Sequence, residues 1–345
     1  MSSSHSTFSP TTLVEIGTKV ISGMGAPLDL ASAVSKSLVL SNLVGHDSHG
    51  IIRLMEYSGW VESGNLIPGN YPKVEWIKEA TALIDGGWGW GQSASYLATE
   101  TVIELARKYG TATVVLSKTN HVGRLGEYVD LMATAGMMGI AFCNTGGPIV
   151  APFGGVKRVL GTNPFAWSVP GSKDYNFVLD FSTAVVAAGK IILAGMNGEV
   201  IEPGSLIDKN GIASTNAADL ADGGSLLAFG GHKGSGLSVL IDVAAGILSG
   251  NMPAAISESG FGNGTVFIAI DIARYATGDL FRSIAAQFET IMHQAGEPDA
   301  VLLPGEFEYK TRAFREHHGV LIGDGIRENI CQIAKNYRVV LPEFA

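Results

Sequence analysis

The segment "GHDSHGIIRLMEY", residues 45–57, gathers side chains suited to acid–base and anion-binding chemistry, including two of the chain's eight histidines. A helix is expected to begin near Ser48. His49, Arg53 and Tyr57 then lie at positions i, i+4 and i+8 and share one helix face. An imidazole, a forked cation and a phenol suit a small substrate whose carboxylate adjoins a carbonyl. The alternative is an ordinary helix start, with Ser48 as the N-cap and Arg53 in solvent.

Three further segments place polar or glycine-rich sequence in loops, two of them just beyond predicted strands. His121 follows a buried strand, where α/β folds often place reactive loops. Asp180 ends another strand, and Ser182 is expected to cap a helix whose free amides suit a dinucleotide pyrophosphate. Lys233 lies in "GGHKGSG", a glycine-rich loop that enters a helix and suits a phosphate. Taken alone, a turn histidine is the better explanation of the first segment, and a capped strand–helix junction that of the second.

Two common nucleotide-binding signatures are missing from the sequence. The glycine-rich segments 86–93 and 260–265 lack the spacing and context of a G-x-G-x-x-G turn between a strand and a helix. The loop around Lys233 is not a P-loop, because GxxxxGK[ST] is absent. These observations disfavour a Rossmann dehydrogenase.

The order of predicted elements indicates an α/β fold, with a mixed sheet and helices contributed by both chain ends. Residues 9–64 have helical periodicity, with Ser9 and Pro10 starting the first helix and Gly23 ending it. The segments 163–170 and 176–181 are too close for an intervening helix, which favours antiparallel pairing. Further strands are predicted at 111–116, 138–144, 264–272 and in "GVLI", and helices at 183–195, 234–248, 277–296 and from about 305.

Three parts of the chain are expected to act as units. Residues 1–75 with 309–345 form a helical lobe for substrate binding and dimerisation. Residues 76–196 with 231–308 form a cofactor-binding α/β lobe, and 197–230 form an irregular excursion rich in Gly, Asp, Asn and Ser.

Composition narrows the classes of function. The chain has 345 residues and a formal net charge of −9, which argues against nucleic acid or an anionic membrane as a partner. Two cysteines exclude a disulfide scaffold, and no apolar stretch is long enough to span a bilayer. The N-terminal sequence lacks the features of a secretory signal. We expect a cytoplasmic protein.

The separated motifs resemble one known family. "GHDSHGIIRL", "TNHVGRLGEY", "GTNPFAWSVP", "LDFST" and "GGHKGSGLSVLID" occur in the order seen in the malate/L-lactate dehydrogenase type-2 family. The resemblance runs from about residue 10 to the end of the chain. It implies a non-Rossmann, NAD(P)-dependent oxidoreductase, usually a homodimer. Family substrates include malate, sulfolactate, ureidoglycolate, diketogulonate and cyclic imino acids such as piperideine-2-carboxylate.

Carried over by position, the resemblance assigns roles to individual residues. His49 and His121 become the candidate acid–base pair, while Ser48 and Arg53 position the substrate. The expected substrate contacts also include Tyr57 and Thr162. The cofactor is expected to contact Asn144, Asp180, Phe181, Ser182, Thr183, Ala184, His232, Lys233, Gly305, Glu306 and Phe307.

The sequence departs from the family pattern beside His121. Leu125 stands where many members have a small residue, and Arg124 precedes it. "LDFST" also replaces commoner versions that end in small residues. The choice between NAD and NADP, and between a 2-oxo acid and an imine, stays open.

The predicted function is hydride transfer between a nicotinamide and the carbon α to the carboxylate of a small substrate, without a metal. The alternative is a metal-dependent hydrolase or lyase that uses His46, Asp47, His49 and His121. The spacing His-x-x-His is not the i, i+4 pair common in zinc hydrolases. A third possibility is a nucleotide-binding protein without catalytic activity.

Overall fold

The computed structural model describes residues 5–171, 174–197, 200–257, 261–297 and 300–342. Its centre is a seven-stranded sheet in the order β2-β3-β4-β11-β5-β6-β7. These strands are β2 Lys73–Lys78, β3 Thr81–Asp85, β4 Thr111–Ser117, β11 Asn263–Asp271, β5 Met137–Thr145, β6 Phe165–Val169 and β7 Phe177–Phe181. Within this sheet β3 and β4 are parallel, and the other neighbouring strands are antiparallel. The predicted mixed sheet and the antiparallel pairing of β6 with β7 are confirmed.

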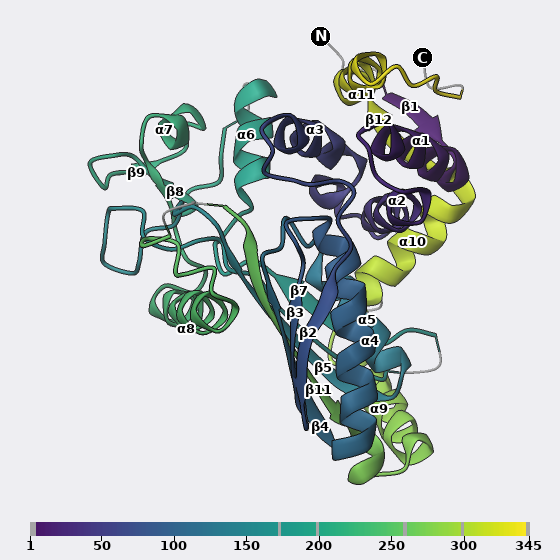
Figure 1. The fold of residues 1–345 in the computed structure, drawn as a ribbon. Coiled ribbons are helices and arrows are strands. Elements are labelled where there is room, and N and C mark those ends of the chain that lie inside the picture. The colour runs from purple at the N-terminus through teal and green to yellow at the C-terminus, as the bar shows by residue number, and fades with distance from the viewer. Residues whose placement is uncertain (1–4, 172–173, 198–199, 258–260, 298–299, 343–345) are drawn as a thin grey trace.

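Two helices cover one face of the sheet (Figure 1). They are α4, Gly91–Tyr109, and α5, Leu125–Thr134. Strand β4 alternates buried and less buried residues, because its apolar side chains such as Val114 and Leu116 point toward this helical layer. Packing of this layer fixes the end of β4 and the start of α5, and the loop containing His121 lies between them.

Both ends of the chain build a separate helical layer above the sheet (Figure 1). From the N-terminal part come α1 Pro10–Gly23, α2 Leu28–Leu43 and α3 Leu54–Glu62, and from the C-terminal part α10 Glu306–His318 and α11 Asp324–Asn336. Ser9 caps α1 by accepting a hydrogen bond from the Thr12 amide at 3.0 Å. The sequence did not predict β1, His5–Phe8, which pairs antiparallel with β12, Val320–Gly323.

The predicted irregular excursion has more structure than expected. It contains a three-stranded sheet of β8 Leu206–Ile207, β9 Ala213–Ser214 and β10 Ser225–Leu226, together with α7 Ala218–Ala221. This sheet shares a small core with Val150 and Leu160 from the preceding loops. The helix predicted at 183–195 is displaced, because α6 spans Ala188–Asn197.

The last helices flank the sheet and leave apolar faces exposed. Helix α8 spans His232–Ser249, η3 spans Ile272–Arg274 and α9 spans Gly278–His293. The apolar stripe of α9 faces solvent: Leu280, Ile284, Phe288 and Ile291 are 53–63% exposed. No helix in the described ranges is long and apolar enough to cross a membrane.

Candidate active site

The segment that follows α2 is not the single helix that the sequence predicted. It makes two short 3-10 turns, η1 Asp47–His49 and η2 Ile51–Arg53, before α3 begins at Leu54. Buried Asn42 explains the difference, because its amide accepts from the Ile51 N–H at 2.9 Å and donates to Asp47 at 2.7 Å. A side chain at Gly50 would begin 2.3 Å from that amide. The local hydrogen bonds of Asn42 therefore replace the first helical turn, and Ser48 is not a helix N-cap.

The two turns nevertheless bring the predicted acid–base pair together. The imidazole rings of His49 and His121 are stacked, with centroids 5.4 Å apart and planes at 30°. The Tyr57 hydroxyl lies 2.8 Å from Nδ1 of His121, and Gln92 Nε2 donates to the same hydroxyl at 2.6 Å. Because Gln92 donates to its oxygen, Tyr57 donates to His121, whose neutral ring then has its proton on Nε2.

The loop containing His121 is fixed by the start of α4. A side chain at Gly91 would begin 2.4 Å from the carbonyl oxygen of His121, so only glycine allows this approach. Buried Asn120 donates to the carbonyl oxygens of Trp88 at 2.7 Å and Gly89 at 3.0 Å. The histidine therefore stands on a loop with little freedom to move.

Burial and nearby positive charge lower the pKa of both histidines. Burial lowers the pKa of His49 from 6.5 to about 3, with further lowering by Arg53, His46 and Arg124. Burial also lowers the pKa of His121 well below its usual value, and Arg53 and His49 lower it further. Both rings are therefore neutral at pH 7 in the free protein. A neutral imidazole is a proton acceptor, and a bound anion beside Arg53 would favour its protonated form.

Arg53 is held beside the histidine pair by two contacts. Its Nε donates to the Ser48 carbonyl oxygen at 2.7 Å, and its Nη1 pairs with the carboxylate of Glu56. The Ser48 hydroxyl lies 3.1 Å from Nδ1 of His49. These contacts fix the Arg53 guanidinium and the His49 ring on one short turn. A substrate carboxylate could replace Glu56 as the partner of Arg53.

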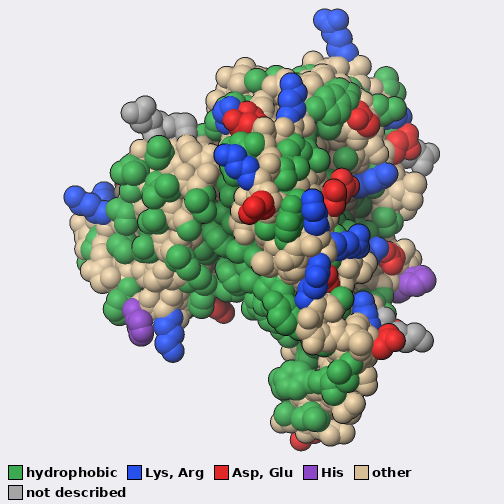
Figure 2. Space-filling view, turned by 60° about the horizontal axis from the view of Figure 1, so that its bottom comes forward, with side chains coloured by type: hydrophobic (Ala, Val, Ile, Leu, Met, Phe, Trp, Pro, Cys, Tyr) green, Lys and Arg blue, Asp and Glu red, His purple; other side chains and the backbone are tan. Residues whose placement is uncertain are grey.

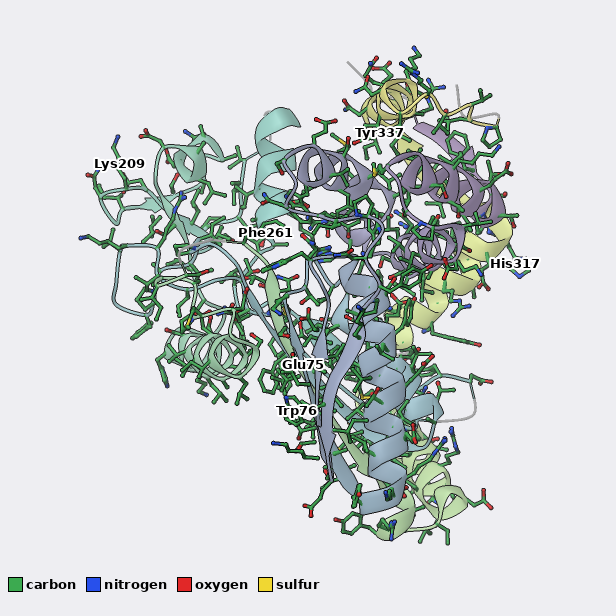
Figure 3. All side chains as sticks on the ribbon, in the orientation of Figure 1. Glu75, Trp76, Lys209, Phe261, His317 and Tyr337 are labelled. Atoms are coloured by element: carbon green, nitrogen blue, oxygen red, sulfur yellow. The ribbon has the colours of Figure 1, made fainter. Side chains whose placement is uncertain are left out.

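Aromatic side chains line the neighbourhood of Tyr57. Its ring packs against Trp60 at 5.5 Å, and Trp60 meets Phe261 edge-on at 5.1 Å. Trp88 lies 6.1 Å from Phe261. Figure 3 shows Phe261 below α3, beside the central sheet. Such an apolar wall suits the uncharged part of a substrate or cofactor ring.

The loop before α8 has features that fit a phosphate group. Gly230 and Gly231 have positive φ values of 56° and 62°, which glycine adopts without strain. A side chain at Gly234 would begin 2.0 Å from the Phe229 carbonyl oxygen, so the first turn of α8 lies close to the preceding chain. Lys233 is exposed and takes part in no ion pair found among the described residues. An unpaired cation on a glycine-rich helix N-terminus is suited to a phosphate.

The turn after β7 is built differently from its prediction. The hydroxyls of Ser182 and Thr183 both donate to the Thr162 carbonyl oxygen, at 2.9 and 3.0 Å. Ser182 also accepts from the Ala184 amide at 3.0 Å, but α6 begins only at Ala188, so Ser182 does not cap it. The backbone of Thr162 is therefore hydrogen-bonded to the turn after β7. Phe181 packs edge-on against Phe229, which links the turn to the loop before α8.

Several other predicted cofactor residues use their side chains within the protein. Asn144 is buried, donates to Asp242 at 2.9 Å and accepts from Asn251 at 2.9 Å. Asp180 accepts a hydrogen bond from the Gly126 amide at 2.6 Å, and Glu306 accepts one from the Leu303 amide at 3.0 Å. The His232 ring meets that of Phe153 edge-on, and Gly305 lies beside β7 with a φ of 91°. Phe307 is 55% exposed.

Helix α10 supports the turn in a way that the sequence did not suggest. Arg315 forms a two-point ion pair with Asp47, at 2.8 and 3.1 Å, and Glu308 lies 3.1 Å from His46. These contacts occupy two residues of the alternative metal site. Across the described ranges, no group of three His, Cys, Asp or Glu side chains is placed to hold a metal ion. The geometry does not support the metal-dependent hydrolase or lyase.

Sequence reasoning also missed Gln92, whose buried amide holds Tyr57. A signal was present, because Gln92, Ser95 and Thr99 follow helical spacing on the buried face of α4. Polar residues on a core-facing stripe need hydrogen-bond partners, and the partner of Gln92 is the Tyr57 hydroxyl.

Comparison with known proteins identifies the family of this chain. A family model described as malate/L-lactate dehydrogenase matches residues 8–331. Hydroxycarboxylate dehydrogenase B of Escherichia coli O157:H7 is 34% identical over 99% of this chain and 97% of its own. The Δ1-pyrroline-2-carboxylate reductase of Ancylobacter novellus is also 34% identical, over 88% of this chain and 90% of its own. The structure of malate dehydrogenase from Pyrococcus horikoshii OT3 has a TM-score of 0.88 and 31% identity, covering 98% and 97% of the two chains.

The family match and these relatives define an oxidoreductase of the hydroxy-acid dehydrogenase or imine reductase class, for which the family implies a nicotinamide cofactor. The chain belongs to the malate/L-lactate dehydrogenase family.

Proposed function

We propose that the enzyme transfers hydride between a nicotinamide and the carbon α to the carboxylate of a small 2-oxo acid or cyclic imino acid. The observation that carries this proposal is the stacked His49–His121 pair, with Arg53 fixed on the same turn. A guanidinium can bind a carboxylate in two-point geometry, which also orients the adjacent carbon. The aromatic side chains around Tyr57 supply the uncharged wall.

His49 is the proposed proton donor in the direction of reduction. The substrate carboxylate binds Arg53, and this offsets the charge that lowers the pKa of His49 most after burial. A nicotinamide bound here would supply the hydride to the α carbon, and His49 gives its proton to the carbonyl oxygen or imine nitrogen. In oxidation the same ring, neutral in the free protein, accepts that proton. Acid–base help of this kind contributes about 10²–10⁴-fold.

The cofactor phosphates are proposed to lie at the loop before α8. Lys233 and the amides of the first turn of α8 supply positive charge there. The Phe181–Ala184 turn adjoins this loop through the contact between Phe181 and Phe229. Gly305 lies against the start of β7 instead, so a cofactor touching both segments would extend along that strand. The cofactor is NAD or NADP.

The proposed assembly is a homodimer. Helix α8 has an apolar stripe of Leu240, Val243 and Ile247, which are 60%, 45% and 59% exposed. Figure 2 shows hydrophobic side chains gathered across the hollow between two lobes of the molecule. Contiguous exposed apolar patches are rare on monomers and mark association surfaces. Sedimentation of Leu240→Lys and Ile247→Lys tests this: a dimer that both variants leave intact would exclude α8 from the interface.

The absorbance of reduced nicotinamide, followed with both cofactors against 2-oxo acids and cyclic imino acids, tests the proposed activity. We expect turnover of at least one substrate that has a carboxylate next to the reacting carbon. Cofactor binding without turnover of any such compound would instead support a nucleotide-binding protein without this activity.

A further inference from the structure

Helix α10 contacts the start of the active-site turn, residues 47–53, through two side chains that the proposed mechanism does not use. Glu308 lies 3.1 Å from the His46 ring, and Arg315 pairs with the Asp47 carboxylate at 2.8 and 3.1 Å. Glu308 and Arg315 are seven residues apart, so they lie two turns apart on the same face of the helix. This face of α10 therefore holds the chain just before the residues proposed to act on the substrate.

Arg315 makes more contacts than an ordinary surface ion pair. Its guanidinium donates at two points to Asp47, and its Nη1 also donates to the carbonyl oxygen of Asn42 at the end of α2. The side-chain amide of Asn42 donates to the Asp47 carboxylate at 2.7 Å. Arg315, Asp47 and Asn42 thus form a closed network. Two-point ion pairs and networks are the arrangements in which a surface arginine contributes most.

This network holds both halves of the active-site turn. Asp47 is the first residue of η1, which ends with His49, and the Asn42 side chain accepts from the Ile51 N–H at the start of η2. Each half is a 3-10 turn of three residues, and neither has a side-chain cap. Such short turns have poor hydrogen-bond geometry of their own. Their conformation therefore depends on contacts from outside, and Arg315 supplies the only charged ones printed for Asp47 among the described residues.

We propose that Arg315 is a positioning residue for the reaction, which acts through Asp47 to set where the His49 ring lies and thereby sets the rate of proton transfer. The inference rests on the proposed function, in which His49 donates the proton. Misplacement of a reacting group by about 1 Å can slow a reaction about 100-fold. Loss of Arg315 should therefore slow the chemical step without weakening cofactor binding at the loop before α8.

The test compares Arg315→Met with Arg312→Met, a matched control on the same helix. Arg312 also pairs with a carboxylate, Glu316 at 2.8 Å, but this pair lies within α10, and Arg312 is 50% exposed against 24% for Arg315. We expect Arg315→Met to lower kcat about 10- to 100-fold with the Kd of reduced nicotinamide unchanged, and Arg312→Met to keep the wild-type kcat. Arg315→Lys should recover part of kcat, because an ammonium can pair with Asp47 but lacks the planar fork.

Two results would overturn the proposal. One is a wild-type kcat in Arg315→Met, measured below its thermal unfolding midpoint, because the ion pair would then be structural only. The other is an equal loss of kcat in Arg312→Met, because the effect would then not depend on the contact with the turn.

Replacement of Asp47 tests whether Arg315 acts through this residue. In an Asp47→Asn background, Arg315→Met should lower kcat little further, because the two side chains act through one contact. If the two losses multiply, Arg315 does not act through Asp47 and the proposal is wrong. If Arg315→Met does not fold, Asp47→Asn removes the ion pair from its other end and carries the comparison with wild type, which an unchanged kcat would contradict.

A further measurement separates this inference from the proposed function. If the wild type turns over no 2-oxo acid or cyclic imino acid, the proposed function fails, and NMR of labelled histidine then follows His49 directly, with its signals assigned through His49→Gln. Changed His49 ring signals in Arg315→Met, but not in Arg312→Met, support the positioning role. Unchanged signals, or an equal change in both variants, contradict it.

Discussion

Replacement of Arg53 by glutamine is expected to weaken capture of the substrate carboxylate. A charge-assisted hydrogen bond contributes ~1.5–3 kcal/mol. Arg53 must first release Glu56, whose carboxylate is partly exposed, and such exposed ion pairs are worth ~0.2–1 kcal/mol. The net loss for Arg53→Gln is therefore about 2 kcal/mol, which lowers kcat/KM by about 30-fold. Arg53→Lys should recover only part of this, because an ammonium lacks the planar fork.

The same substitution should change the pH dependence of the reaction. After burial, Arg53 is the first cause of the lowered pKa of both His49 and His121. Its removal raises both pKa values, so the acid limb of the oxidation rate moves to higher pH, because oxidation needs a neutral imidazole. Steady-state kinetics between about pH 4 and 9 would show this shift.

Glu56→Gln is the matched control, since it frees Arg53 without removing its charge. We expect its KM for the carboxylate substrate to stay at or below the wild-type value. If Arg53→Gln keeps the wild-type kcat/KM and its pH profile, Arg53 does not bind the carboxylate and the reasoning is wrong.

Three other changes have defined outcomes. Tyr57→Phe leaves Gln92 and His121 without the bridging hydroxyl. It should lower the free energy of unfolding, measured with denaturant, by about 1–3 kcal/mol, and lower kcat more than it raises KM. An unchanged kcat would show that this bridge does not orient the His121 ring. Lys233→Ala should raise the Kd for reduced nicotinamide about tenfold by fluorescence titration, and an unchanged Kd would move the phosphate site elsewhere. Because the folded pKa of His49 is about 3 against 6.5 when unfolded, its stabilising effect is complete above pH 6.5 and is lost as pH falls toward 3. In His49→Gln the denaturation midpoint should therefore vary less over that range, and an identical slope would contradict the lowered pKa.

Much of the architecture was predictable because it depends on local periodicity. The buried strand at 111–116 and the paired strands after residue 163 follow from runs of β-branched and aromatic residues. The start of α1 followed from Ser9 and Pro10, whose local chemistry is independent of the rest of the chain. Strand β1 was missed because it is four residues long and depends on pairing with β12, more than 300 residues away.

The site was predictable in its residues but not in its geometry. The spacing of His49, Arg53 and Tyr57 suggested one helical face, whereas Asn42 folds the segment into two short turns through contacts that no local pattern reveals. Tyr57 was expected only as a substrate contact, and its hydrogen bond to His121 was not predicted, since the loop that carries this histidine reaches the turn only in the folded chain. The sequence predicted helix α9 but not the exposure of its apolar stripe, because amphipathic periodicity does not reveal what covers the apolar face.

The most direct test of the central claim is the rate of hydride transfer in a single turnover, compared between His49→Gln and His121→Gln. If His49 donates the proton, its replacement should slow this step by about 10²–10⁴-fold while cofactor affinity stays near normal. His121→Gln should act more on substrate binding, because its ring packs against His49 and is held by Tyr57. In the wild type the reduction rate should fall as pH rises through the pKa of the donor in the substrate complex. If neither variant slows hydride transfer by more than a few-fold, the stacked pair is not the acid–base centre.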